Sequence, residues 1–143
     1  MQVSQAMTPD VVSVPPDTTL MEAARLMKGL DVGPLPVRDD GRLIGVVTDR
    51  DITVRATAEG RDPLTTEVRE VMTPNVVYCR QDEDVREVAK LMQDAQLRRL
   101  LVVDGEMRLV GIVSLGDLVL HSGDDKLAGK TLGKVSEPRD PQE

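Results

Sequence analysis

The stretch Leu-Ile-Gly-Val-Val-Thr-Asp-Arg-Asp at residues 43–51 returns at residues 109–117 as Leu-Val-Gly-Ile-Val-Ser-Leu-Gly-Asp. The residues that precede each copy also repeat in the same order. For example, Met7-Thr8-Pro9 returns as Met72-Thr73-Pro74. Self-similarity of this kind indicates a duplicated structural unit. We therefore expect two tandem repeats that pack together around a pseudo-two-fold axis, and the seam between like units is a natural place for a ligand cleft.

Each repeat contains the same order of expected elements. A β-branched strand follows each Thr-Pro break, and a helix with apolar residues at helical spacing comes next. Thr19 to Glu22 and Asp84 to Glu87 both resemble capping boxes at the start of these helices. The predicted first strands span 11–14 and 76–79, and the later strands span 35–37, 43–47, 100–103 and 109–113. Second helices are expected from Asp49 and Leu115, which predicts an α/β (α+β) fold of two β-α-β-β-α units.

The repeats also predict the domain organisation. We expect the first repeat, with a short N-terminal segment, over residues 1–60. A polar connector and the second repeat should occupy residues 61–122. Residues 123–143 mix charge with Gly and Pro, so a flexible C-terminal tail is expected there.

Composition excludes several classes of function. The net charge of −7 disfavours nucleic acid, which requires a basic surface. Cys79 is the single cysteine, so no intramolecular disulfide can form. No apolar run reaches the roughly 18 residues that span a bilayer. These features favour a soluble cytoplasmic protein, and a flat ligand would be held between aliphatic side chains because Tyr78 is the one aromatic residue.

The junction Thr48-x-x-Asp51 and its counterpart Ser114-x-x-Asp117 carry the most informative chemistry. One interpretation is a helix cap, in which the hydroxyl accepts from a backbone N–H three residues on. Another is a ligand site, since a carboxylate at a strand end can accept both hydroxyls of a ribose, and a helix N-terminus offers N–H groups to an anion. The residues alone leave both interpretations open.

The Met-Thr-Pro starts, the Pro36-Val37 strand and the Gly-x-Val-Thr/Ser-x-x-Asp ends resemble cystathionine-β-synthase (CBS) domains, of which two form the tandem pair called a Bateman module. The resemblance covers roughly residues 3 to 121 and recurs in register. It implies regulatory, energy-sensing binding of an adenosine-containing ligand (AMP, ADP, ATP, S-adenosylmethionine or NAD) in the cleft between repeats. Pairs in this family often dimerise, so a homodimer is expected.

The resemblance also implies roles for particular residues. Asp51 and Asp117 would take the ribose hydroxyls, assisted by Thr48 and Ser114. Leu101 is a mild departure, because the family usually has Pro at that position. The adenine would lie against two sets of apolar residues: Val11, Val12, Leu35 and Pro36 at one site, and Val76, Val77, Leu100 and Leu101 at the other.

Phosphates require cations, and two places offer them. Arg98 and Arg99 match a basic pair in nucleotide-sensing members such as the regulatory subunit of AMP-activated kinase, although they could instead cap a sheet edge or pair with surface carboxylates. The matching first-repeat positions are uncharged, while Arg50 in the first junction is replaced by Gly116 in the second. The two clefts are therefore chemically unequal, and we expect either tighter binding at one of them or occupancy of only one.

The remaining candidates favour no catalysis. His121 has no second His or Cys nearby, so no metal site is expected, and Cys79 should be an inert residue of the core or of a sheet edge. No nucleophile–base set can be assembled, so we expect no enzyme and no required cofactor. The alternatives are a ligand-free interaction module and, less favoured, a small nucleotide-processing enzyme. The sequence leaves open the physiological nucleotide, the occupied cleft, the regulated partner and the dimer geometry.

Overall fold

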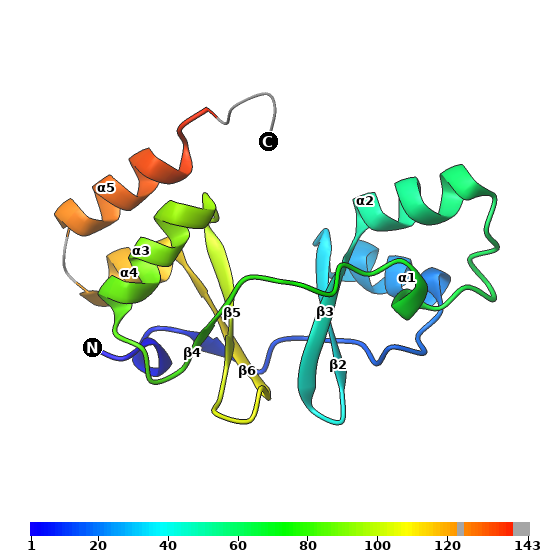
Figure 1. Cartoon of the computed structure of the whole chain (residues 1–143), viewed down its shortest axis with the longest axis horizontal. Helices are drawn as coiled ribbons and strands as arrows, with labels where there is room; N and C mark the ends of the chain where they lie inside the picture. Colours follow the sequence, from blue (N-terminus) through cyan, green and yellow to red (C-terminus); the bar gives the residue numbers. More distant parts are fainter. Residues whose placement is uncertain (123–124, 139–143) are drawn as a thin grey trace. The chain divides into compact units, whose positions relative to one another are not determined.

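A computed structural model describes residues 1–122 and 125–138 of the chain (Figure 1). The chain forms two compact units. The central unit consists of residues 12–76, and the flanking unit combines residues 1–11 with the chain from residue 77 onward. Each unit has its own hydrophobic core, so each is described by itself.

The central unit is a helix and a hairpin followed by irregular helical turns. Its elements are α1 (Leu20–Leu30), β2 (Pro34–Asp39), β3 (Arg42–Thr48), α2 (Asp49–Asp51), the π-helical turn η2 (Ile52–Ala56), and the 3₁₀ turns η3 (Thr57–Glu59) and η4 (Val68–Glu70). The hydroxyl of Thr19 accepts from the Glu22 N–H at 3.2 Å and so caps α1 as predicted. The buried face of α1 packs with alternate residues of β2 and β3, such as Leu35 and Val47.

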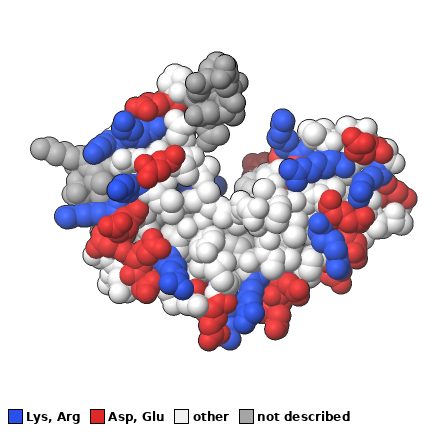
Figure 2. Space-filling view, viewed as in Figure 1, with Lys and Arg blue, Asp and Glu red and all other residues white. Residues whose placement is uncertain are grey.

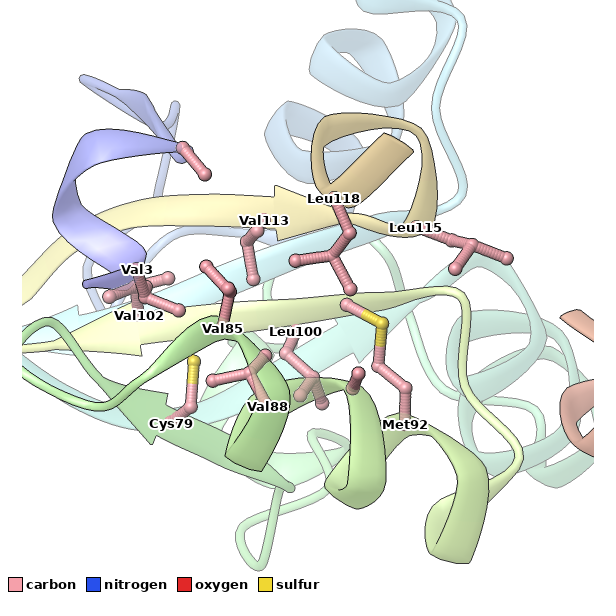
Figure 3. Packing of buried hydrophobic residues seen from close by; sticks show 12 residues of the cluster. Val3, Cys79, Val85, Val88, Met92, Leu100, Val102, Val113, Leu115 and Leu118 are labelled. Atoms are coloured by element: carbon pink, nitrogen blue, oxygen red, sulfur yellow. The ribbon is translucent and has the colours of Figure 1, made fainter. Parts of the chain in front are cut away.

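The flanking unit is a four-stranded sheet with three helices. Its elements are η1 (Val3–Gln5), β1 (Thr8–Pro9), β4 (Tyr78–Arg80), α3 (Val85–Ala95), β5 (Arg99–Val103), β6 (Leu109–Ser114), α4 (Leu115–Ser122) and α5 (Asp125–Val135). The strand order is β1-β6-β5-β4, with β4 parallel to β5 and the other pairs antiparallel. Figure 3 shows the packed core, in which Val88 and Met92 of α3 lie against the β5 residues Leu100 and Val102.

The fold class is confirmed, because both halves of the sequence contain a helix, two antiparallel strands and a second helix in the predicted order. The predicted first strands are shorter than expected. Val14 makes only an isolated bridge to Val37, and β4 begins at Tyr78. Pro15 and Pro16 follow Val14 and lack the N–H groups that would extend a ladder.

The Met-Thr-Pro segment that opens each sequence repeat packs on the other repeat's strand. Thr8 and Pro9 pair with β6, and Thr73 pairs with Val46 of β3 through hydrogen bonds of 2.8 and 3.0 Å. The compact units therefore do not coincide with the expected ranges 1–60 and 61–122, because residues 61–76 complete the central unit. Val68, for example, is fully buried there, and its N–H donates to the Thr18 carbonyl at 2.8 Å.

The segment expected to be a flexible tail contains a helix. Residues Asp125–Val135 form α5, which packs against α3 and α4. The Gln96 amide just after α3 donates to the carbonyls of Lys134 at 3.3 Å and Glu137 at 2.9 Å. The structure thus has a helix within the segment that the sequence predicted as a tail, and residues 123–124 and 139–143 lie outside the described residues.

Candidate functional site

At the first junction, Thr48 and Asp51 are joined by reciprocal hydrogen bonds where β3 enters α2. The Asp51 N–H donates to Thr48 Oγ1 at 3.0 Å, and the Thr48 N–H donates to Asp51 Oδ2 at 2.9 Å. This is a capping box with Asp as its acidic partner. The predicted cap is confirmed, and it uses one of the two carboxylate oxygens of Asp51.

Among the described residues, the hydrogen-bond and ion-pair partners of the second oxygen of Asp51 lie at long distances. Thr73 Oγ1 lies 3.5 Å from Asp51 Oδ1, and the Arg55 guanidinium lies 3.8 Å from the same oxygen. Both distances exceed the usual hydrogen-bond length, so Oδ1 retains capacity to accept a shorter bond. Asp51 is 8% exposed and is the one charged residue that is buried in the described part of the chain.

The second junction repeats the capping box where β6 enters α4. The Asp117 N–H donates to Ser114 Oγ at 3.1 Å, and the Ser114 N–H donates to Asp117 Oδ2 at 2.8 Å. Asp117 is partly exposed, and no hydrogen bond or ion pair to its Oδ1 is seen among residues 1–122 and 125–138. Each junction thus presents a carboxylate held by one oxygen, with the other oxygen available.

The two junctions differ in their N–H groups. In α2, the Asp49 N–H donates to Gly33 O and the Arg50 N–H donates to the Asp49 carboxylate at 3.0 Å. With the Asp51 N–H also bonded, the first turn of α2 offers no N–H to an anion. In α4, Leu115 replaces Asp49, and the Gly116 N–H has no partner in the described part of the chain.

The cations are also unequally distributed, as expected from the sequence. The Leu115 N–H donates to the Arg98 carbonyl at 2.8 Å, and Arg99 pairs with Ser114 across the β5–β6 ladder. Arg98 and Arg99 therefore lie directly beside the second junction, where the first has Gly33 and Pro34. Arg50 is exposed in α2.

The predicted adenine-contacting residues fall into three groups. Leu35 is 1% exposed and Leu100 is 2% exposed, and both are packed inside the core of their own unit. Pro36 and Leu101 follow them and point to the opposite face of the strands. Four residues lie nearer the surface, with Val12 and Val77 exposed and Val11 and Val76 half-buried.

Sequence reasoning did not assign Arg55 and Thr73 to the site. Arg55 could have been found from its position four residues after Asp51, which favours an ion pair on a helix. Thr73 could not, since its approach to Asp51 depends on the packing of its segment on β3.

Cys79 and the metal-ligating side chains were the other candidates. Burial, with a smaller contribution from the charge of Glu83, raises the pKa of the Cys79 thiol to about 12. Within residues 1–122 and 125–138, no three His, Cys, Asp or Glu side chains are grouped so as to hold a metal ion. Among those residues, no helix is both long and apolar enough to cross a bilayer. On the face drawn in Figure 2, acidic and basic side chains lie interspersed.

A family model described as the CBS domain matches residues 3–56 and 68–124. The chain belongs to the CBS-domain family. Its two CBS repeats match the two copies of the strand–helix junction, so the family and the tandem arrangement predicted from the repeats are confirmed.

Known CBS proteins resemble the chain over most of its length. The CBS domain-containing protein YhcV of Bacillus subtilis (strain 168) is 43% identical over 134 residues, which cover 94% of each chain. The structure of Hypoxic Response Protein I with two coordinated zinc ions has a TM-score of 0.74 at 36% identity, covering 85% of this chain and 98% of that one. The structure of CBSX2 in complex with AMP has a TM-score of 0.71 at 31% identity, covering 87% and 98%.

Proposed function

We propose that this CBS pair is a regulatory module that binds an adenosine-containing nucleotide (AMP, ADP, ATP, S-adenosylmethionine or NAD type). It relays that occupancy through a dimer or partner contact. One observation carries the proposal: Asp51 and Asp117 are each fixed through one oxygen by a backbone N–H, which leaves the other oxygen to accept from a sugar hydroxyl. The complex of CBSX2 with AMP supports the choice of ligand class.

A fixed carboxylate suits a vicinal diol. Ribose hydroxyls donate to carboxylate oxygens through charge-assisted bonds, which are shorter and stronger than neutral ones. The capping box sets the carboxylate orientation before the ligand arrives, so little ordering cost is added on binding. Thr48 and Ser114 act by holding this orientation.

We assign the phosphate to the Ser114 junction. Arg98 and Arg99 flank that junction, and one N–H group of α4 is unpaired among the described residues. At the Thr48 junction, Asp49 adds a second negative charge and consumes the Arg50 N–H. The Arg50 side chain is exposed there and contributes a weaker, solvent-screened attraction.

Occupancy must be relayed through a surface. Val119 and Leu120 of α4 are exposed by 44% and 79%, which favours contact with a second copy of the chain or with a regulated protein. Ligand binding would favour the arrangement that it contacts best.

Thermal denaturation with each of the five nucleotides tests the proposal. A ligand at 100 times its dissociation constant adds about 2.7 kcal/mol to the apparent stability. The matched variants are Asp51→Asn and Asp117→Asn, because Asn keeps an oxygen for the cap but removes the charge. We expect each variant to bind its ligand about tenfold more weakly.

Three outcomes separate the alternatives. Unchanged melting curves with all five nucleotides at millimolar concentration would support the ligand-free interaction module instead. Equal nucleotide affinity of the wild type and both Asn variants would show that the two carboxylates do not contribute to binding. Conversion of the bound nucleotide to another compound, detected by chromatography, would support the nucleotide-processing enzyme.

A further inference from the structure

We propose that Arg55 is a positioning residue that holds the Asp51 carboxylate and the backbone of residues 71–73 together. A ligand hydroxyl bound at Asp51 then also fixes the segment through which the chain leaves the central unit. The coupling to ligand rests on the proposed function, whereas the anchoring of residues 71–73 is a property of the unliganded protein.

The guanidinium of Arg55 contacts two consecutive carbonyls. Its NH1 nitrogen donates to Val71 O at 3.0 Å and to Met72 O at 3.2 Å. The same nitrogen lies 3.8 Å from Asp51 Oδ1. Because one guanidinium nitrogen has two hydrogens, both are used by the carbonyls, and Asp51 feels the positive charge without taking either proton.

Thr73 closes the arrangement from the other side. Its hydroxyl lies 3.5 Å from Asp51 Oδ1, and its backbone pairs in both directions with Val46. The carboxylate is therefore bordered by the side chain of Arg55 and by the segment that Arg55 holds. Movement of residues 71–73 would alter the surroundings of the oxygen that we assign to the ligand.

The local backbone is unusual at this place. Arg55 lies in η2, a π-helical turn in which the Thr57 N–H donates to the Ile52 carbonyl. Such turns are rare and are frequently found at functional sites. The turn occurs in the central unit, whereas α4 is a regular helix at the matching position.

The second repeat lacks this anchor. His121 corresponds to Arg55 in the register that aligns Asp51 with Asp117, and it is exposed. No bond from His121 to Ala6 or Met7, and none from Thr8 to Asp117, occurs within the described residues. The two junctions therefore share a capping box but differ in whether the Met-Thr-Pro segment is fastened to it.

The direction of the coupling follows from linkage. If Arg55 holds Asp51 where a hydroxyl can reach it, binding of that hydroxyl must stabilise the anchored segment by the same factor. A nucleotide should then slow local opening of residues 71–73. Removal of Arg55 should abolish this effect even where the nucleotide still binds.

Hydrogen exchange of individual amides in the unliganded full chain tests the anchoring. The reporters are the N–H groups of Met72, bonded to Val68 O, and Thr73, bonded to Val46 O. We expect Arg55→Met to speed their exchange about tenfold while strand β5 of the flanking unit is unchanged. Arg55→Lys should restore part of the protection, since an ammonium can still donate to one carbonyl.

Two control variants change residues outside the proposed anchor. Arg25→Met removes an exposed arginine of α1, and His121→Ala changes the matching position of the other repeat. Neither should alter exchange at Met72 or Thr73. Unchanged exchange in Arg55→Met, or equal acceleration of every amide in the central unit, would overturn the anchoring.

A second measurement adds AMP at matched occupancy. We expect AMP to slow Thr73 exchange in the wild type and to leave it unaltered in Arg55→Met. Slowing that persists fully in Arg55→Met would overturn the coupling while leaving the proposed function intact. If calorimetry shows that the wild type binds none of the five nucleotides, the proposed function and the coupling are both overturned. Exchange in the unliganded protein would still decide the anchoring.

Discussion

Gly45 of β3 lies so close to Thr73 that a Cβ atom on the glycine would stand 2.8 Å from the Thr73 carbonyl oxygen. Gly111 of β6 has the same relationship to Thr8, also at 2.8 Å. Real Cβ atoms do not approach backbone this closely, so both glycines are required by the segments packed against them.

Gly45→Ala and Gly111→Ala should each lower the free energy of unfolding by about 1–3 kcal/mol, because the added methyl group must displace backbone. Urea unfolding followed by circular dichroism measures this change. Gly105→Ala is the control, since nothing lies within 4 Å of its added Cβ. Equal stability of Gly45→Ala and Gly105→Ala would show that the Met-Thr-Pro segment is not held on the sheet.

Removal of a cap hydroxyl should weaken each junction. Thr48→Ala and Ser114→Ala each lose the acceptor for an N–H three residues on, at a cost of about 1 kcal/mol. Thr48→Ser keeps the hydroxyl and should keep most of the stability. Chemical denaturation of the three variants without ligand measures the cap separately from any binding effect.

The buried thiol of Cys79 predicts a pH dependence. Burial raises the pKa of this thiol from its ordinary value of 9.0 to about 12 in the folded protein, so the folded state holds the proton more tightly. The resulting stability is complete below about pH 9 and is lost as the pH rises toward 12. The urea midpoint should therefore fall over this range more steeply in the wild type than in Cys79→Ala.

Reaction of Cys79 with a thiol reagent offers an independent check. At pH 8 the native thiol should react far more slowly than the thiol of the urea-unfolded chain, because the thiolate is the reactive form. Comparable rates in the two states would contradict the burial of this side chain.

Docking of α5 should depend on Gln96. Its amide donates to the Lys134 carbonyl in the last turn of α5 and to the Glu137 carbonyl just beyond that helix, and its backbone has a φ of 53°. Gln96→Asn tolerates that φ but is too short to make both bonds. We expect faster amide exchange at Ser136 in this variant, with α3 unaffected. A similar substitution at the exposed Gln5, which is remote in sequence, should leave Ser136 unchanged.

Leu120 is the most exposed large apolar residue among the described residues, at 79%. If α4 contributes to a homodimer, Leu120→Glu should shift light-scattering mass toward that of a monomer, because a charge would be buried at the contact. Leu64→Glu, at a residue of 58% exposure in the central unit, is the matched control. A wild-type monomer at working concentration would contradict the dimer.

The repeated pattern predicted most of the fold. Apolar spacing and cap residues such as Thr19 are local features, and the observed α1 begins one residue later, at Leu20. The junction Thr48-x-x-Asp51 was likewise predictable, since its reciprocal bonds join residues three apart. These features require no knowledge of distant contacts.

What was missed depends on contacts between segments far apart in sequence. Thr73 reaches Asp51 only because its segment pairs with Val46, and periodicity says nothing about which strand a short segment joins. Helix α5 was missed because its charged and Gly-containing sequence forms a helix through packing on α3. The sequence predicted free N–H groups at the start of α2. The structure differs there because the Arg50 N–H donates to the carboxylate of the neighbouring Asp49.

The pairing of each Met-Thr-Pro opening with the opposite repeat has a consequence for how such a chain could arise. In a protein with a single repeat, the Met-Thr-Pro segment of one copy would pair with the strand of a second copy. Two copies would therefore have to exchange these segments to complete either fold. Gene duplication with fusion turns that exchange between molecules into one within a single molecule, and the register of Gly45 and Gly111 still preserves it.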